Sequence, residues 1–259
     1  MSFFDFNRAI IRHASQRVAD GLRAVDMGSP SFEGVQSEQY AYIAALKAAG
    51  VTVIELLPLE RFPDSLFVED TALVFSGAAI LLNPGAPTRR GEAAEIAPVL
   101  EQQFRHVLKL EEGSADGGDI LTTPRGVFIG VSQRTSPQGA RALMSLLNKI
   151  GMHGRAVSTP AGVLHLKSDC ALLDEETVLC TPRLAASDVF DGFRTILTPP
   201  GEEAAANAVR IGDRVLVSRG YPRTAELLED AGLAIIPLAT DEIGKIDAGL
   251  SCMSLRWRA

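Results

Sequence analysis

A loop that leads into a strand decides the predicted fold, in the stretch Ile246-Asp247-Ala248-Gly249-Leu250-Ser251-Cys252-Met253-Ser254-Leu255-Arg256-Trp257. Small residues before Cys252 favour a loop, and the alternating residues after it are typical of a strand. The thiol of Cys252 is therefore expected where a loop enters a sheet, which suits a presented nucleophile. A lone cysteine is usually a small buried hydrophobic residue, so the rest of the chain has to decide.

One order of elements recurs along the chain: a short strand, a loop with acidic or small residues, a two-stranded hairpin and a helix. The junctions between loop and hairpin fall at Asp70, Asp119, Asp169, Asn207 and Cys252. A period of roughly 40 to 50 residues indicates units that pack around an axis. The sequence thus predicts an α/β five-bladed pseudo-symmetric propeller, as a single domain over residues 1–259. An ordinary α+β domain with a chance period is the alternative.

Predicted helices cover residues 93–104, 140–150 and 223–231, with a shorter segment at 184–193. The second of these helices has Ser136 and Pro137 as its start signals. The fifth copy lacks one hairpin arm and a helix after Cys252. Residues 6–12 and 37–49, near the other end of the chain, are the candidates to supply them.

Equivalent units would bring their junction loops together on the axis, and with them Asp70, Asp116, His165 and Cys252. A thiolate is a nucleophile, and a neighbouring imidazolium lowers its pKa and can protonate a leaving group. Carboxylates oppose thiolate formation, so their presence suits a cationic substrate. A guanidinium fits, because it is planar, binds carboxylates through several N–H groups and has an electrophilic carbon.

Composition limits the possible partners. The net charge of -7 argues against nucleic acid and suits a small cationic substrate. The N-terminal residues lack the apolar core of a signal peptide, and no stretch is long enough for a membrane span, so a cytoplasmic protein is expected. The three cysteines indicate free thiols, with Cys170 and Cys180 as packing residues.

Four motifs follow in order: Asp64-Ser65-Leu66-Phe67-Val68-Glu69-Asp70, Asp116-Gly117-Gly118-Asp119, Leu164-His165-Leu166-Lys167 and Leu250-Ser251-Cys252-Met253-Ser254-Leu255. Their order and spacing resemble the dimethylarginine dimethylaminohydrolases of the guanidine-modifying (pentein) superfamily. The resemblance implies a five-bladed α/β propeller that hydrolyses N-omega-methylated arginine to citrulline and a methylamine, with neither metal nor organic cofactor. It also implies a homodimer.

Site residues are implied by the same resemblance. Cys252 would attack the guanidinium carbon, and His165 would protonate the departing amine and then activate water. Asp116 would orient His165 or hold the guanidinium, which Asp70 would bind directly. The implied substrate-binding set is Leu22, Asp64, Glu69, Asp70, Arg89, Arg134, Ile246 and Ser251. Within it, Arg89 and Arg134 suit an α-carboxylate, and Leu22 lies in a segment that could act as a lid.

Each of these residues also has a structural interpretation. His165, between two leucines, could be a satisfied core histidine, Arg89 part of a solvated helix start, and Asp116 part of a turn. Cys252 and His165 could bind an inhibitory metal, although two ligands are too few for a structural zinc site. The rival functions are another guanidine hydrolase, such as an arginine deiminase, and a non-catalytic binding propeller.

Overall fold

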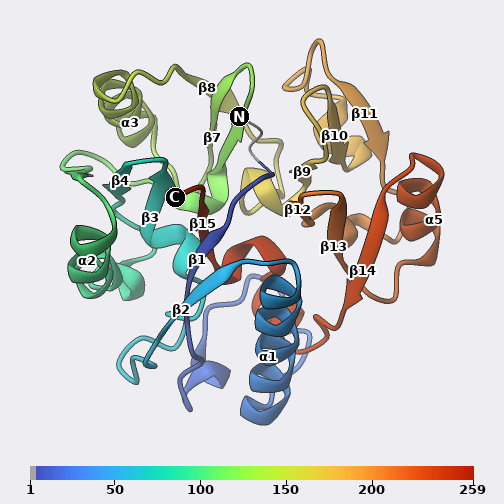
Figure 1. The fold of residues 1–259 in the computed structure, drawn as a ribbon, viewed down its shortest axis with the longest axis horizontal. Coiled ribbons are helices and arrows are strands. Elements are labelled where there is room, and N and C mark those ends of the chain that lie inside the picture. Colours follow the sequence, from blue (N-terminus) through green and yellow to red (C-terminus); the bar gives the residue numbers. More distant parts are fainter. Residues whose placement is uncertain (1–3) are drawn as a thin grey trace.

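The computed structural model describes residues 4–259. Residues 1–3 lie outside the described residues. They belong to the predicted domain and to the N-terminal stretch from which a signal peptide was expected to be absent. Five three-stranded sheets surround a common axis, with the larger helices on their outer side (Figure 1). This arrangement confirms the predicted five-bladed α/β propeller, while the single domain over 1–259 stays a prediction.

Every blade has the same topology: its first two strands are antiparallel, and its third runs parallel to the middle one. The blades are β15 (Leu255–Trp257), β1 (Arg8–Arg12) and β2 (Thr52–Leu56); β3 (Ala72–Phe75), β4 (Ala78–Leu81) and β5 (His106–Lys109); β6 (Ile120–Thr123), β7 (Gly126–Val131) and β8 (Gly154–Ser158); β9 (Cys170–Leu172), β10 (Thr177–Cys180) and β11 (Arg194–Leu197); β12 (Val209–Ile211), β13 (Arg214–Ser218) and β14 (Ala234–Leu238). The helices are α1 (Phe32–Ala48), α2 (Glu92–Gln103), α3 (Pro137–Lys149), α4 (Pro182–Ala185) and α5 (Pro222–Asp230).

The repeat begins at a different point from the predicted one. The prediction grouped each strand with the hairpin that follows it, whereas the structure pairs it with the hairpin before it. Thus β5 pairs in parallel with β4, which precedes helix α2 in the chain, while β5 follows that helix. Two parallel strands need a crossover, so the strand after each helix returns to the sheet that the chain had left.

The first blade is assembled from both ends of the chain. Strand β1 pairs antiparallel with β15, where Ile10 faces Leu255, and in parallel with β2. The prediction that residues 6–12 supply the missing arm is confirmed, and α1 is the missing helix.

The start of helix α1 differs from the predicted one because of a capping residue. Helix α1 begins at Phe32 rather than at residue 37, since the Ser31 hydroxyl accepts a hydrogen bond from the Gly34 N–H. Ser136 caps α3, which begins at Pro137, so the predicted serine and proline start signals are confirmed. Proline is well suited to that first position, because it has no N–H to leave unpaired there.

Apolar packing between sheets and helices fixes the blades. In the second and third blades, Leu143 and Leu147 of α3 pack in one buried cluster with Val127 and Ile129 of β7. Burying a side chain of this kind contributes about 1.5–3 kcal/mol. The blades thereby form a fixed frame for the turns at their inner ends.

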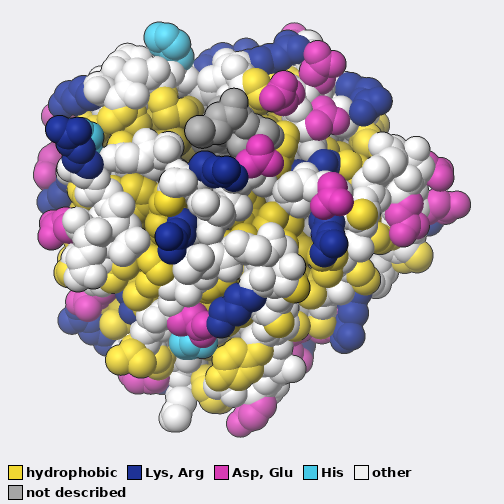
Figure 2. Space-filling model, in the orientation of Figure 1, with side chains coloured by type: hydrophobic (Ala, Val, Ile, Leu, Met, Phe, Trp, Pro, Cys, Tyr) yellow, Lys and Arg dark blue, Asp and Glu magenta, His cyan; other side chains and the backbone are white. Residues whose placement is uncertain are grey.

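The outer surface is mixed in character. On the face that Figure 2 shows, Lys and Arg side chains are interspersed with acidic and apolar ones. Within residues 4–259, none of the helices has the length and apolar character that crossing a bilayer requires.

Candidate active site

Five short 3-10 turns lead into the inner strands of the blades, at Val68–Thr71, Gly117–Asp119, Leu166–Ser168, Glu203–Ala206 and Leu250–Met253. Cys252 lies on the last of these turns, just before β15 rather than in the strand. Asp70, His165 and Cys252 line one pocket at the centre of the ring. The predicted convergence of distant junctions is therefore what the structure shows.

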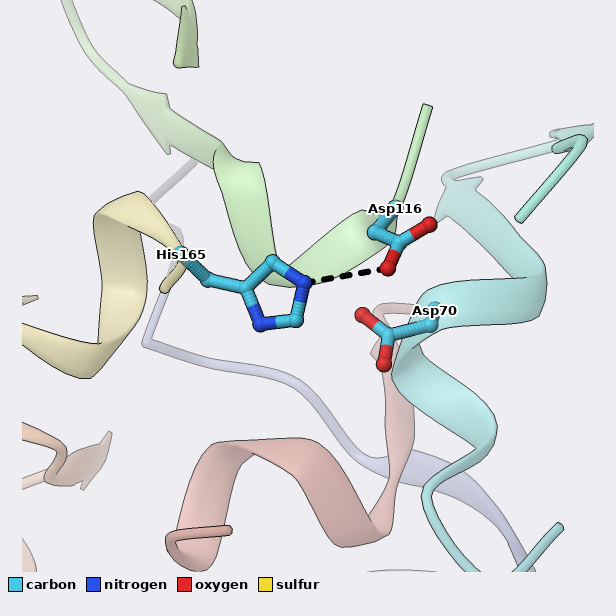
Figure 3. A group of neighbouring side chains, drawn as sticks. All are labelled: Asp70, Asp116 and His165. Carbon is cyan, nitrogen blue, oxygen red and sulfur yellow. Dashed lines mark hydrogen bonds and ion pairs between the residues drawn. The ribbon is translucent and has the colours of Figure 1, made fainter. Parts of the chain in front are cut away.

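His165 and Asp116 form the central pair of the site. The Nε2 atom of His165 lies 3.0 Å from Oδ2 of Asp116 (Figure 3). Asp116 is 0% exposed, and its Oδ1 atom accepts a hydrogen bond of 2.7 Å from the Gly85 N–H. A carboxylate held in this way fixes the orientation of the imidazole, so His165 is no isolated core histidine.

Asp70 lies beside this pair, with its carboxylate directed toward the ring of His165 (Figure 3). Its Oδ1 atom accepts a 2.8 Å hydrogen bond from the Gly118 N–H, and its Oδ2 atom accepts one of 2.5 Å from Arg89. A Cβ at position 118 would lie 2.9 Å from Cγ of His165 and 3.1 Å from Oδ1 of Asp70. Glycine at this position is what allows the three functional groups to approach one another.

The acidic surroundings change the ionisation of the site. Burial lowers the pKa of His165, but the charge of Asp70 and the hydrogen bond to Asp116 outweigh it and raise the pKa to about 9. Burial, together with the charges of Glu69 and Asp70, raises the pKa of Cys252 to about 12. At neutral pH the resting site therefore contains an imidazolium and a neutral thiol.

Asp70 itself is held as a carboxylate. Burial alone would raise the pKa of Asp70, but the positive charges of His165 and Arg89 and the Gly118 N–H outweigh it and lower the pKa. An ionised acid at the pocket surface is suited to a cation.

Arg89 and Arg134 both line the pocket, but their surroundings differ. Arg89 is 4% exposed and donates to Asp70, to Glu92 and to two backbone carbonyl groups. These partners make Arg89 a support for Asp70 and leave it little capacity for the predicted α-carboxylate. Arg134 is partly exposed, and its Nη1 atom lies 3.9 Å from Asp116, so its guanidinium is the better placed of the two for that contact.

Glu69 and Ser251 do not line this pocket, contrary to the prediction of substrate contacts from both residues. The Glu69 carboxylate is paired with Lys167 at 2.7 Å and with Arg256 at 3.0 Å, and it accepts a 2.9 Å hydrogen bond from the Ser251 hydroxyl. Successive side chains on a 3-10 turn point about 120° apart. Glu69 and Ser251 therefore face away from the side that Asp70 and Cys252 face, and contribute to a second cavity of about 530 Å³.

Leu22, Asp64 and Ile246 lie on the pocket wall, as predicted. Oδ1 of Asp64 accepts a 2.9 Å hydrogen bond from the Leu22 N–H, which ties the N-terminal segment to the site. The Ala24 N–H donates to the side chain of Asp247, which also lines the pocket. These two hydrogen bonds hold the segment that carries Leu22 against the pocket.

The carboxylates and the imidazole also resemble a partial metal site, because ligand atoms of Asp70, Asp116 and His165 lie within 4.8 Å of one another. However, a protonated imidazole has no lone pair for a metal, and one oxygen of Asp70 already accepts from Arg89. The chemistry of these donors favours proton transfer over metal binding.

Asn207 is a polar residue of the site that sequence reasoning placed at a junction without giving it a role. The residue is 5% exposed, and its side chain lies against the turn that carries Cys252, with Nδ2 4.0 Å from Sγ. Its position in the repeat, equivalent to that of Asp70, was the available signal.

Comparison with known proteins agrees with this geometry. The arginine deiminase family model matches residues 58–208, more than half of the chain. An N(G),N(G)-dimethylarginine dimethylaminohydrolase from Pseudomonas aeruginosa is 37% identical over 254 residues, which cover 97% of this chain and 100% of the relative.

Two solved structures are similar over nearly the whole chain. One is a dimethylarginine dimethylaminohydrolase from Pseudomonas aeruginosa, a cysteine-to-serine mutant complexed with citrulline, with a TM-score of 0.95, 37% identity and coverage of 98% of this chain and 100% of that one. The other is an adduct of a histidine-to-glycine dimethylarginine dimethylaminohydrolase with S-methyl-L-thiocitrulline, with a TM-score of 0.94, 37% identity and coverage of 97% and 99%. Sequence identity over nearly the full length, on the same fold, shows that this chain belongs to the dimethylarginine dimethylaminohydrolase family.

Proposed function

We propose that the protein hydrolyses N-omega-methylated arginine to citrulline and methylamine or dimethylamine, through a covalent intermediate on Cys252. The observation that carries this proposal is one pocket lined by a cysteine, by a histidine bound to a buried aspartate and by a second aspartate. Relatives of the same family are known in complex with citrulline and as an adduct with S-methyl-L-thiocitrulline.

The first half of the reaction forms a carbon–sulfur bond. The Cys252 thiolate attacks the guanidinium carbon, and the bond from that carbon to the methylated nitrogen breaks. His165 supplies the proton that the departing amine takes up. Because Nε2 donates to Asp116, Nδ1 is the nitrogen that can give up this proton.

The second half of the reaction releases citrulline. Neutral His165 takes a proton from water, and the resulting hydroxide attacks the carbon of the thiouronium. The carbon–sulfur bond then breaks, which yields the urea group of citrulline and returns Cys252 and the imidazolium to their starting forms. In this scheme Asp70 and Asp64 hold the guanidinium, and Arg134 pairs with the α-carboxylate, with Leu22 and Ile246 along the substrate.

Charge explains how a thiol with a raised pKa becomes reactive. Asp70 opposes the thiolate in the resting site, and its charge is neutralised when a guanidinium binds against it, so the bound substrate favours the anion. The cation that the enzyme recognises thus also helps to prepare the nucleophile.

The ionisation of the free enzyme predicts a specific pH profile. Attack requires a thiolate beside an imidazolium, a state with one proton fewer than the resting site. His165, with a pKa of about 9, releases the first proton before Cys252, whose pKa is about 12. The fraction of enzyme that has lost one proton therefore increases up to about pH 9. We expect kcat/KM to rise about tenfold per pH unit below about pH 9 and to level off above it.

Initial rates of citrulline formation at low substrate concentration, from pH 6 to 10, test this profile. Ordinary pKa values would give a plateau already between pH 6.5 and 8.5. A flat kcat/KM across pH 7 to 8.5 would contradict the raised pKa of His165. At saturating substrate, kcat should level off at a lower pH, since the bound cation favours the thiolate.

The choice of substrate distinguishes this activity from that of an arginine deiminase. A panel of arginine, monomethylarginine and both dimethylarginines, read out by the amine released as well as by citrulline, should give the higher kcat/KM for a methylated substrate. Preference for plain arginine, with ammonia as the product, would overturn the proposal. A cytoplasmic location and a homodimer stay expectations from the sequence and from the family resemblance.

A further inference from the structure

The junction turns are linked around the ring by a repeated hydrogen bond. Oδ1 of Asp70 accepts from the Gly118 N–H at 2.8 Å, and Oδ1 of Asp119 accepts from the Leu166 N–H at 3.0 Å. At the corresponding place Oδ1 of Asn207 accepts from the Ser251 N–H at 2.9 Å. In each case a junction side chain holds the turn of the next blade, and Asn207 holds the turn of the nucleophile.

An aspartate would accept the hydrogen bond from the Ser251 N–H equally well. The reason for an amide at position 207 therefore lies in its nitrogen, Nδ2. The second oxygen of Asp70 accepts from Arg89, and that of Asp119 accepts from the Ser132 hydroxyl at 2.6 Å. Both of these environments provide donors. A carboxylate is the suitable group in both places.

The second arm of Asn207 lies among acceptors. Nδ2 donates to the Lys167 carbonyl at 3.0 Å and to the Ser251 hydroxyl at 3.2 Å, and it lies 4.0 Å from Sγ of Cys252. The two backbone partners fix the amide, because the Ser251 N–H requires an oxygen and the Lys167 carbonyl requires an N–H. A carboxylate oxygen here would face a carbonyl oxygen and the sulfur.

The loop before the nucleophile is shaped around this amide. A Cβ at Gly249 would lie 2.4 Å from Cγ of Asn207 and 2.7 Å from its Oδ1. The chain therefore approaches Asn207 too closely for any side chain at position 249. Asn207 in turn fixes the path of the backbone into Cys252, whose N–H donates to the Gly249 carbonyl.

We infer that Asn207 is a positioning residue for the nucleophile: it fixes the turn that carries Cys252 and places an amide nitrogen, rather than a carboxylate oxygen, 4.0 Å from the sulfur. The inference rests on the nucleophilic role of Cys252 in the proposed function. Glu69 and Asp70 already place negative charge near the sulfur, with Lys167 as a nearby cation and His165 on the same pocket. An aspartate at the fourth junction would add a further carboxylate at the thiol, and the amide replaces that charge with a donor.

Alkylation of Cys252 by iodoacetamide at pH 9, located by mass spectrometry, tests the inference without any guanidine substrate. Asn207→Ala removes the donor, and we expect alkylation to slow several-fold. Asn207→Asp keeps the shape and the bond to Ser251 but brings a negative charge to about 4 Å from the sulfur. We expect it to slow alkylation by a further factor of about 10 or more, since one pKa unit changes the thiolate fraction tenfold.

The order of the two variants separates electrostatics from packing. A merely structural role predicts that Ala, which loses all three contacts, is the more harmful change. Gln39→Ala is the matched control, because Gln39 also accepts one backbone N–H, from Ala14, and donates to one backbone carbonyl, of Arg12. This control should lower the melting temperature and leave the alkylation rate of Cys252 unchanged.

Three results would overturn the inference: alkylation of Asn207→Asp at the wild-type rate, slower alkylation of Asn207→Ala than of Asn207→Asp, or alkylation of Asn207→Ala as fast as that of Gln39→Ala. If the Asp variant does not fold, the comparison of the two Ala variants still decides. Failure of the proposed function appears separately, in the substrate panel, because iodoacetamide reports on the thiol alone.

Discussion

Replacing Cys252 with serine should lower kcat for dimethylarginine by at least about 10⁴-fold, the largest effect expected for any single change in this protein. A hydroxyl has a far higher pKa than a thiol, and the carboxylates around position 252 oppose an alkoxide even more strongly. The groups that hold the guanidinium remain in place, so binding should persist. Citrulline formation measures the loss, and calorimetry with dimethylarginine measures the retained affinity.

Cys180→Ala provides the control for this change. Cys180 is also a free cysteine, but it is fully buried in β10, within the apolar cluster of the fourth blade. Its replacement should cost stability through lost packing and leave kcat unchanged. Activity above about one per cent of wild type in Cys252→Ser would mean that another group, or water directly, attacks the substrate.

Replacing His165 with glycine should have the second largest effect, a decrease of about 10³ to 10⁴-fold in kcat/KM for dimethylarginine. The departing amine would lose its proton donor, and water would lose its base. S-methylthiocitrulline separates the two roles, because a thiol leaves without prior protonation. This variant should release about one equivalent of methanethiol and then stop, with a mass adduct on Cys252.

His13→Ala is the matching histidine control. His13 is paired with Glu55 at the surface, 3.0 Å from its carboxylate, and does not line the pocket. Its loss should leave both substrates turning over. Continued turnover of S-methylthiocitrulline by His165→Gly would show that His165 is not the base of the second step.

The central residues of the site could be predicted from sequence because their positions follow from the period of the repeat. Asp70, His165 and Cys252 are far apart along the chain, yet each lies at or near the same point of a blade. Equivalent points of a closed ring meet at its axis, whatever the details of packing. The predicted starting point of each repeat was wrong, because the strand after each helix pairs with the hairpin before that helix.

Side-chain direction could not be predicted from sequence. Glu69 and Asp70 are neighbours, but the 3-10 turn at Val68–Thr71 directs their carboxylates to different cavities. Arg89 carries the charge that an α-carboxylate needs, yet Glu92 and Asp70 already bind it. The role of Asn207 depends on which groups face each arm of its amide, and that information exists only in three dimensions.

The first blade has a consequence for how the protein matures. Because β15 completes a sheet begun by β1, the ring stays open in a nascent chain until nearly all of the described residues have been synthesised. Cys252, on the turn just before β15, is among the last parts to be placed. The active-site thiol is therefore absent from an incomplete chain, and the enzyme becomes active only when β1 and β15 have paired.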